Sequence, residues 1–208
     1  MSIGEESFAN SQNVSRETLE RLKIYEVLLT KWTSKINLVS KSTIPDMWTR
    51  HFLDSAQVFS QIPKEATKLA DFGSGGGFPG LVVAAISAEK LPELSVVLIE
   101  SDLRKASFLM AAAREMGVEV DVLSERVENA PEQCADVVTA RALAPLVNLL
   151  EMTEKHLKKD GTALFLKGAS HEAELDMARN MWDFNVKKYE SVTSNDSALL
   201  QVNNLRRA

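Results

Sequence analysis

The sequence predicts an α/β fold built on a doubly wound, mostly parallel sheet. From residue 66 onward, segments with strand-like and helix-like patterns alternate along the chain. The strand candidates are nearly continuous apolar runs, such as residues 96–99, which is typical of parallel strands covered by helices on both faces. We therefore divide the 208 residues into an N-terminal helical extension, 1–65, and one α/β domain, 66–208, within one compact unit.

The N-terminal extension is predicted to contain two helices after a frayed, polar start at residues 1–13. The first helix begins after Ser15, whose side chain suits an N-cap. Its apolar stripe consists of Leu19, Leu22, Tyr25, Leu29 and Trp32. The second helix is expected from about Thr43 to Ser60.

The α/β domain is expected to alternate strands and helices up to residue 167. Strands are predicted at Lys68–Phe72, Ser95–Glu100, Glu119–Ser124, Asp136–Ala140 and Ala163–Lys167. Helices are predicted at Pro79–Ala88, Asp102–Met116 and Leu146–Leu157, with a further short segment near Val127–Ala130. After a helix at His171–Met181, strand candidates at Val186–Val192 and Ala198–Val202 flank a turn-rich segment, which predicts a closing antiparallel hairpin.

A glycine-rich loop joins the first predicted strand to its helix. It reads Asp71-Phe72-Gly73-Ser74-Gly75-Gly76-Gly77-Phe78-Pro79-Gly80. Its five glycines let the backbone turn tightly and approach a ligand with no Cβ in the way. Two cofactors compete for this loop. Gly75-x-Gly77-x-x-Gly80 satisfies the dinucleotide fingerprint, whereas Asp71-x-Gly73-x-Gly75-x-Gly77 fits the nucleoside-binding loop of S-adenosylmethionine methyltransferases.

Two carboxylates favour S-adenosylmethionine over NAD. Asp71, at the end of the first strand, would repel a pyrophosphate but suits a ligand that carries an amino group and a sulfonium. Glu100 ends the second strand, where a carboxylate can accept both ribose hydroxyls of a nucleoside. Val127 and Glu128 follow the third strand, where a backbone amide is expected to meet the adenine edge. The region after residue 167 is also too short to form the separate substrate region of a dehydrogenase.

The loop after the fourth strand bears on the acceptor atom. Methyltransferases that attack exocyclic amines commonly carry Asp/Asn-Pro-Pro-aromatic there, whereas this chain has Thr139-Ala140-Arg141-Ala142. Cytosine-C5 enzymes use a cysteine nucleophile, but the single cysteine, Cys134, lacks a Pro-Cys setting, and we interpret it as a small buried hydrophobe. A ring nitrogen with an in-plane lone pair, such as guanine N7, needs neither device, because alignment with the sulfonium methyl suffices.

Further polar residues are expected to gather near the acceptor. Arg141 and Lys167 end two parallel strands, at the edge where doubly wound folds bind ligands, and each suits contact with a base or a phosphate. Arg50, His51 and Asp54 share one face of the second helix. Taken alone, Arg50 and Asp54 are more simply interpreted as an exposed ion pair.

Five short segments form a recognisable set: Ile36-Asn37-Leu38, Arg50-His51-x-x-Asp54-Ser55, Asp71-x-Gly73-x-Gly75-x-Gly77-Phe78-Pro79-Gly80, Ala140-Arg141-Ala142 and Lys167-Gly168. Together they resemble the bacterial small-subunit rRNA methyltransferase G family, also called the glucose-inhibited division protein B family. The resemblance runs from about residue 15 to the C-terminus. The family usually has Ser-Arg-Ala at the fourth strand, so Ala140 removes a hydroxyl there and leaves Arg141 in place.

The resemblance implies a Rossmann-like class I S-adenosylmethionine methyltransferase with an N-terminal helical extension. It implies methylation of N7 of a guanine in the 530 loop of 16S rRNA, at position 527, and we expect direct in-line attack without a covalent enzyme intermediate. The expected cofactor site consists of Asp71, Gly73, Gly75, Gly77, Phe78, Glu100, Val127, Glu128 and Arg141. The expected catalytic and RNA-facing residues are Asn37, Arg50, His51, Asp54, Arg141 and Lys167.

Charge and composition bound the partners. A net charge of −5 argues against a protein that coats RNA by bulk charge. Residues 31–50, however, hold Lys31, Lys35, Lys41 and Arg50 against Asp46 alone, a basic edge that suits one structured site on the small ribosomal subunit or its precursor. We expect a cytoplasmic monomer without a metal or a membrane segment. A small-molecule methyltransferase, a catalytically silent binding module and, more remotely, a dehydrogenase are the alternatives.

Overall fold

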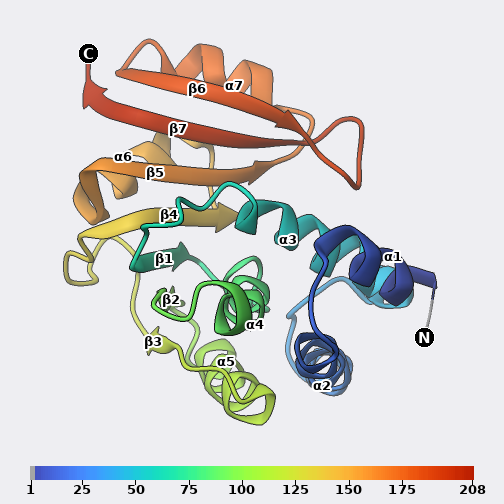
Figure 1. Ribbon diagram of the computed structural model, residues 1–208. Coiled ribbons are helices and arrows are strands. Elements are labelled where there is room, and N and C mark those ends of the chain that lie inside the picture. The colour runs from blue at the N-terminus through green and yellow to red at the C-terminus, as the bar shows by residue number, and fades with distance from the viewer. Residues whose placement is uncertain (1–2) are drawn as a thin grey trace.

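The computed structural model describes residues 3–208 and confirms the predicted fold class (Figure 1). Seven strands form one sheet in the order β3-β2-β1-β4-β5-β7-β6. The first five strands in this order pair in parallel, and the last two join antiparallel. The strand order reverses between β1 and β4. The switch point at which open α/β sheets bind ligands therefore lies at the carboxyl ends of these two strands.

The strands are β1 (Lys68–Phe72), β2 (Ser95–Ile99), β3 (Asp121–Leu123), β4 (Ala135–Arg141), β5 (Leu157–Lys167), β6 (Trp182–Glu190) and β7 (Ala198–Arg207). The predicted closing hairpin is confirmed, because β6 pairs antiparallel with β7. The hairpin reaches further than expected, since β6 begins at Trp182 and β7 runs to Arg207. Trp182 is buried, which explains why pairing starts there.

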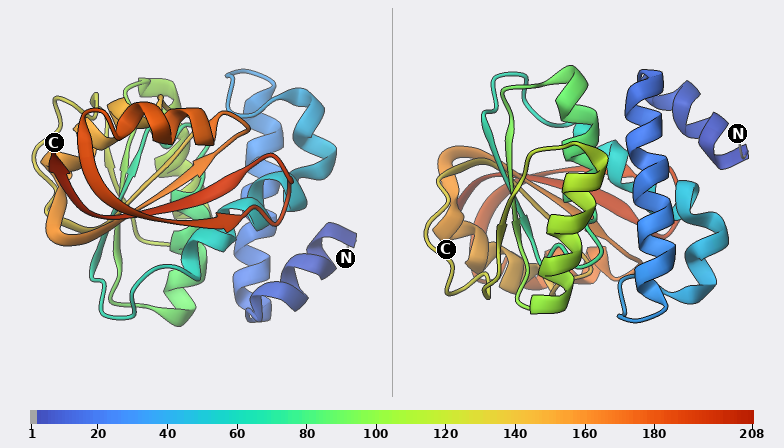
Figure 2. Two further views of the ribbon diagram at one scale, coloured as in Figure 1. Left: turned by 90° about the horizontal axis from the view of Figure 1, so that it is seen from above. Right: turned by 90° about the horizontal axis from the view of Figure 1, so that it is seen from below.

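Helices cover both faces of the sheet, as the apolar strands require (Figures 1 and 2). One face packs against α4 (Gly80–Lys90) and α5 (Leu103–Met116). The other packs against α6 (Leu146–His156) and α7 (His171–Ala178). Helix α2 (Arg16–Thr33) packs on α4 and α5, so its apolar stripe is buried there except for Trp32, which is partly buried. Its N-cap is Ser15, as predicted, whose side chain accepts a hydrogen bond from the Thr18 N–H.

The prediction of a frayed start was wrong, because helix α1 (Ile3–Gln12) occupies most of that segment. Phe8 is fully buried, and its ring meets Trp48 edge-on with centroids 5.6 Å apart. Burial of one aromatic ring in an otherwise polar segment ties the helix to the rest of the extension.

The second predicted helix is divided into three pieces, of which only the last is a regular α-helix. A 3₁₀ turn, η1 (Lys41–Asp46), is followed by a π-helical segment, η2 (Trp48–Leu53), and by α3 (Asp54–Phe59). Segments of π-helix frequently occur at functional sites, because the wider turn re-aims side chains. Here the π segment carries Arg50 and His51.

Two smaller expectations also differ. The segment at Val127–Ala130 is a turn, closed by bonds from the N–H groups of Asn129 and Ala130 to the Arg126 carbonyl. Cys134 is exposed, and the prediction that it is buried was wrong. It lies in a left-handed backbone conformation (φ +46°) in the loop that leads into β4. Within residues 3–208, no helix is both long and apolar enough to cross a membrane, and no group of His, Cys, Asp and Glu is placed to hold a metal.

Candidate active site

The glycine-rich loop follows β1 in a conformation that depends on its glycines. Gly73, Gly75 and Gly77 have φ angles of +61°, +55° and +94°, in the left-handed region that residues with a Cβ rarely adopt. A Cβ on Gly77 would also collide with the Tyr25 hydroxyl and the Leu81 side chain. The loop therefore turns sharply at the switch point and brings its backbone to the carboxyl edge of the sheet.

Asp71 lies beneath this loop and is fully buried. Its Oδ1 accepts a hydrogen bond from the Thr139 hydroxyl at 2.7 Å, and its Oδ2 accepts one from the Gly80 N–H at 3.3 Å. Burial raises the pKa of Asp71 to about 6, against the opposing effect of these hydrogen bonds. The structure thus places Asp71 where it ties β1 to β4 and α4, beneath the position at which we expected it to meet the cofactor's amino group.

Tyr25 is a residue of this site that sequence analysis assigned only to an apolar stripe. The side chain is fully buried, and its hydroxyl donates a hydrogen bond to the Gly76 carbonyl. Its ring stacks on Phe52 and tilts against Phe78, with centroids 5.3 and 5.5 Å apart. The sequence carried one signal for this role: a tyrosine lies in an apolar stripe, and a buried hydroxyl needs a hydrogen-bond partner. Helix α2 therefore holds the glycine loop from outside the α/β domain.

We expect Tyr25→Phe to weaken S-adenosylmethionine binding by about three- to tenfold and to lower stability by about 1 kcal/mol. The substitution keeps the ring packing but leaves the Gly76 carbonyl buried without its donor. Calorimetric titration and thermal unfolding measure the two effects. Tyr189→Phe is the control, because the Tyr189 hydroxyl donates to Gln201 in the β6–β7 hairpin, away from the loop. Equal cofactor affinity in Tyr25→Phe and the wild type would remove Tyr25 from the site.

A cavity of about 390 Å³ opens beside the glycine loop, and we call it the glycine-loop cavity. Of the predicted cofactor residues, those on its wall are Gly73, Gly75, Phe78, Glu100, Val127, Glu128 and Arg141. Asp71, beneath the loop, and Gly77, within it, are not on this wall. Leu38, Leu143 and Met152 complete the apolar part of the wall. Its volume falls in the range of sites that enclose small molecules and cofactors.

Glu100 directly follows β2 on the wall of this cavity and is buried. Its Oε2 accepts a hydrogen bond from the Gly75 N–H at 2.8 Å, and its Oε1 accepts one from the Asp102 N–H at 2.8 Å. Each carboxylate oxygen keeps a second lone pair, so Glu100 can hold the loop and still accept from ligand hydroxyls. Exposed loop backbone, a carboxylate for hydroxyls and apolar walls formed by Phe78 and Val127 are the features that a nucleoside cofactor such as S-adenosylmethionine needs.

Arg141, at the end of β4, connects the glycine-loop cavity to the N-terminal extension. Its Nη1 lies 3.3 Å from Asp54 Oδ2, and its Nη2 lies 3.0 Å from His51 Nδ1. The guanidinium carbon lies 4.5 Å from the centroid of the Phe78 ring. Burial lowers the pKa of Arg141, but a guanidinium remains charged. Asp54 therefore pairs with Arg141 and not with Arg50, which is exposed and contributes its carbonyl at 3.5 Å from Arg141 Nη1.

His51 is a neutral acceptor in this cluster. Burial, with the positive charges of Arg141 and Arg50, lowers the pKa of His51 to about 4. Because a guanidinium only donates, Nδ1 must accept from Arg141, which places the proton on Nε2, 2.8 Å from the Thr43 hydroxyl oxygen. The ring also stacks on Phe78 with centroids 4.9 Å apart. His51 thus orients Arg141, and its ring is uncharged at neutral pH.

The lowered pKa of His51 predicts a specific pH dependence of stability. Its ordinary pKa is 6.5 and its folded pKa is about 4, so the unfolded chain takes up more protons between these values. Stability contributed by the neutral ring is therefore complete above about pH 6.5 and is lost as the pH falls towards 4. Asparagine in His51→Asn keeps an acceptor for Arg141 but does not titrate. As the pH falls over that range, we expect the free energy of unfolding of this variant to fall by about 1–2 kcal/mol less than that of the wild type. This figure allows for solvent screening of the partly exposed ring. Denaturant unfolding at a series of pH values tests this, and parallel profiles would contradict it.

A second cavity of about 390 Å³ lies next to the first, and we call it the hairpin cavity because the turn between β6 and β7 forms one wall. The turn supplies Ser191, Thr193, Ser194 and Ser197. Thr193 donates a hydrogen bond to Asp54 Oδ1 at 3.0 Å, which fastens the turn to the N-terminal extension. Arg141 and Ala142 line both cavities. The two cavities therefore adjoin at one short piece of backbone at the end of β4.

Lys167 lies on the wall of the hairpin cavity but is already engaged. Its Nζ is 2.6 Å from Glu174 Oε2 and donates to the Ala144 carbonyl at 3.0 Å. Only 10% of its side chain is exposed, so it supports the loop after β4. Asn37 is exposed beside Leu38, and lies on the wall of neither cavity.

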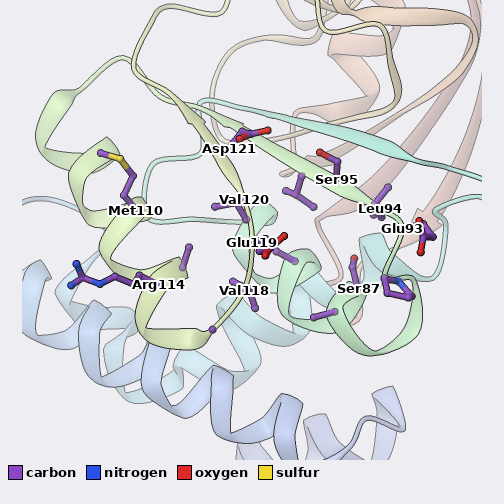
Figure 3. A pocket seen from close by; sticks show the side chains of 16 residues that line it. Ser87, Glu93, Leu94, Ser95, Met110, Arg114, Val118, Glu119, Val120 and Asp121 are labelled. Atoms are coloured by element: carbon purple, nitrogen blue, oxygen red, sulfur yellow. The ribbon is translucent and has the colours of Figure 1, made fainter.

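A larger cavity, of about 870 Å³, opens at the opposite edge of the sheet (Figure 3). It is bordered by Met110 and Arg114 of α5 on one side and by Ser87 of α4 on the other, and Ser95 at the start of β2 contributes to it. It therefore lies at the amino ends of the strands, whereas ligands of doubly wound folds bind at the carboxyl ends. Size alone does not identify the site here.

Comparison with known proteins finds one family over most of the chain. The family model described as rRNA small subunit methyltransferase G matches residues 18–202. A ribosomal RNA small subunit methyltransferase G of Ruegeria sp. (strain TM1040) is 52% identical over 195 residues, which cover 94% of this chain and 95% of that protein. A protein of the same name from Paramagnetospirillum magneticum is 44% identical and covers 99% of this chain and 98% of its own length.

Solved structures show the same fold at low sequence identity. A methyltransferase from Geobacter sulfurreducens has a TM-score of 0.59 at 15% identity and covers 87% of this chain and 88% of its own. M. jannaschii TYW2, solved in complex with AdoMet, has a TM-score of 0.57 at 16% identity and covers 85% of this chain and 80% of its own. With the family match over nearly the whole length, these findings establish that the chain belongs to the rRNA small subunit methyltransferase G family.

Proposed function

We propose that this protein transfers a methyl group from S-adenosylmethionine to N7 of a guanine in the 530 loop of 16S rRNA, by direct in-line attack. Membership of the family supports the general activity, that of an S-adenosylmethionine-dependent methyltransferase of 16S rRNA. The target atom, the RNA loop and the mechanism are our proposal. It follows the residue pattern described above.

The observation that carries the proposal is the wall that the two cavities share at Arg141 and Ala142. The glycine-loop cavity has the features of a nucleoside cofactor site, and the hairpin cavity is polar and lies directly beside it. A nucleotide base bound in the hairpin cavity would lie next to a cofactor bound in the glycine-loop cavity, beside Arg141 and Ala142. Positioning of this kind can supply ~7–11 kcal/mol of a transfer barrier.

The cofactor site is built from parts that the sequence places on three different loops, after β1, β2 and β3. The backbone of Gly73 and Gly75 gives close approach, Glu100 accepts from ribose hydroxyls, and Val127 and Glu128 receive the adenine. When bound, S-adenosylmethionine supplies an electrophilic methyl group on a sulfonium. Tyr25 and Asp71 act indirectly, because they hold the loop in its shape.

The remaining residues suit an acceptor that needs no deprotonation. Guanine N7 carries an in-plane lone pair and no proton at neutral pH, so no general base is required. His51 agrees with this, since its Nδ1 lone pair is engaged by Arg141 and its other nitrogen bears a proton. Arg141 keeps its charge and donors at the shared wall, where it can orient the base or the adjacent phosphate. We propose this orienting role for Arg141, with His51, Asp54 and Phe78 fixing its position.

The RNA is proposed to approach over the N-terminal extension and the β6–β7 turn. Lys31, Lys35, Lys41 and Arg50 are all exposed on the extension, close in sequence to residues that border the two cavities. A local basic edge on an acidic body favours one structured ribosomal site over indiscriminate binding. We propose that the enzyme acts as a cytoplasmic monomer.

The test is transfer of labelled methyl groups to small ribosomal subunits that lack this methylation. Chain scission at N7-methylguanine after borohydride and aniline treatment then locates the product. We expect one new scission in the 530 loop of 16S rRNA. Label confined to small metabolites would favour a small-molecule methyltransferase, and cofactor binding without transfer to any RNA would favour a silent binding module.

A further inference from the structure

The last turn of α6 meets the turn that lies on the far wall of the glycine-loop cavity. That turn spans residues 126–130, and three of its residues, Arg126, Val127 and Glu128, line the cavity. One turn earlier on α6, Met152 lines the same cavity. A single helix therefore forms part of the wall and also reaches behind the adjacent turn.

Lys155 holds this turn from the solvent side. Its Nζ donates to the carbonyls of Glu128 and Ala130, both at 2.7 Å. Charge-assisted bonds to two carbonyls on either side of one residue restrict the turn more than a neutral contact would. Both bonds go to backbone carbonyls and neither to an acidic side chain, so the Lys155 ammonium binds the backbone of the turn.

His156 holds the same turn from the interior. The side chain is fully buried, and its Nε2 lies 2.9 Å from the Val127 carbonyl. Because a carbonyl only accepts, Nε2 carries the proton, and Nδ1 has no hydrogen-bond partner among the described residues. The ring also meets Phe72 edge-on, with centroids 5.3 Å apart, and Phe72 is the last residue of β1 before the glycine loop. His156 thus connects the two loops on opposite sides of the cavity.

We propose that Lys155 and His156 are positioning residues that hold the turn at residues 126–130 in the shape that receives the adenine of S-adenosylmethionine. The inference rests on the proposed cofactor placement and goes beyond it, because neither residue lines the cavity. Three carbonyls of the turn point towards α6, which leaves the opposite side of the turn to face the cavity. Without these bonds the turn is free to vary, and binding must then order it at an entropic cost.

Lys155→Met is the first test, because it removes the ammonium of an exposed residue and leaves the core intact. Calorimetry with S-adenosylmethionine and with 5′-methylthioadenosine, which lacks the methionine arm, measures affinity without any RNA. We expect both dissociation constants to rise by about tenfold, because both ligands present the adenine. In transfer assays the KM for the cofactor should rise, while the kcat and the KM for RNA stay unchanged.

Lys90→Met is the matched control. Lys90 also ends a helix and donates to a backbone carbonyl, that of Gln12 at 2.7 Å, but it lies in the last turn of α4, away from the glycine-loop cavity. We expect it to leave both dissociation constants unchanged. An equal loss of affinity in Lys90→Met would show that the effect of Lys155→Met is not local, and would overturn the proposal.

His156→Gln and His156→Leu form the second test. Glutamine presents an amide donor at the position of Nε2, whereas leucine fills space and leaves the Val127 carbonyl unpaired. We expect His156→Gln to keep affinity within about twofold and His156→Leu to lose about tenfold, measured well below both melting temperatures. Equal affinities of the two variants, or a loss only for ligands with the methionine arm, would overturn the proposal. If the wild type itself fails to bind S-adenosylmethionine, the proposed function fails instead.

Discussion

Replacing Arg141 by alanine is expected to reduce the rate of methyl transfer by on the order of 100-fold or more, with a far smaller effect on the fold. Arg141 lies on the wall between the two cavities and is held there by His51, Asp54 and Phe78. Without the guanidinium, the acceptor loses its orienting contact, although the cofactor loop keeps its own hydrogen bonds. Single-turnover rates at saturating cofactor measure the loss directly.

The stability cost of Arg141→Ala should stay near 1–3 kcal/mol, because Asp54 keeps hydrogen bonds from Gln57 and Thr193. Arg141→Lys is the companion variant. It keeps the charge but loses the planar fork that reaches Asp54 and His51 together, so we expect little recovery of activity. If the transfer rate of Arg141→Ala falls only in proportion to the fraction of that variant that is unfolded, Arg141 acts only on the fold.

Replacing Gly75 by valine is expected to lower cofactor affinity by on the order of 100-fold or more. Its Cβ would have only the Gly73 carbonyl within 4 Å, at 3.7 Å, so the protein itself offers space for a side chain. Because Gly75 lines the glycine-loop cavity, a valine there would occupy the space intended for the ligand. The left-handed backbone at φ +55° adds a strain of about 1–2 kcal/mol.

Gly117→Val separates these two effects. Gly117 has a similar left-handed backbone, φ +65°, at the C-cap of α5, and a Cβ there would meet nothing within 4 Å. It should therefore show a comparable fall in melting temperature with unchanged cofactor affinity. If Gly75→Val binds S-adenosylmethionine as tightly as Gly117→Val does, the placement of the cofactor beside the glycine loop is wrong.

The order of strands and helices was predictable from local pattern, because a parallel sheet covered on both faces leaves continuous apolar runs. Residues 95–99 show this, since all but Ser95 are buried. Local pattern did not predict two parts of the structure of the N-terminal extension. The polar start concealed helix α1, which forms because Phe8 is buried against Trp48 from a different segment. The irregular π segment at Trp48–Leu53 likewise has no local sequence signature.

Parts of the candidate site were predictable for a related reason. Residues at the carboxyl ends of parallel strands, such as Glu100 and Arg141, must lie at one edge of the sheet, so their types and positions indicated the site. Residues that act from behind were not predictable. Tyr25 and His156 bond to backbone carbonyls 51 and 29 residues away in sequence, and nothing in either local pattern identifies these partners. The partner of Asp54 was also unpredictable, because Arg141 is 87 residues distant while Arg50 is adjacent on the same segment.

The most direct measurement of the central claim is mass analysis of 16S rRNA fragments from cells that lack this protein. We predict that one guanine of the 530 loop loses a single N7-methyl group. Reintroduction of the wild-type protein should restore that group, and reintroduction of Arg141→Ala should not. A full complement of methyl groups in the 530 loop of the deletion strain, or a loss at a different RNA position, would contradict the proposed function.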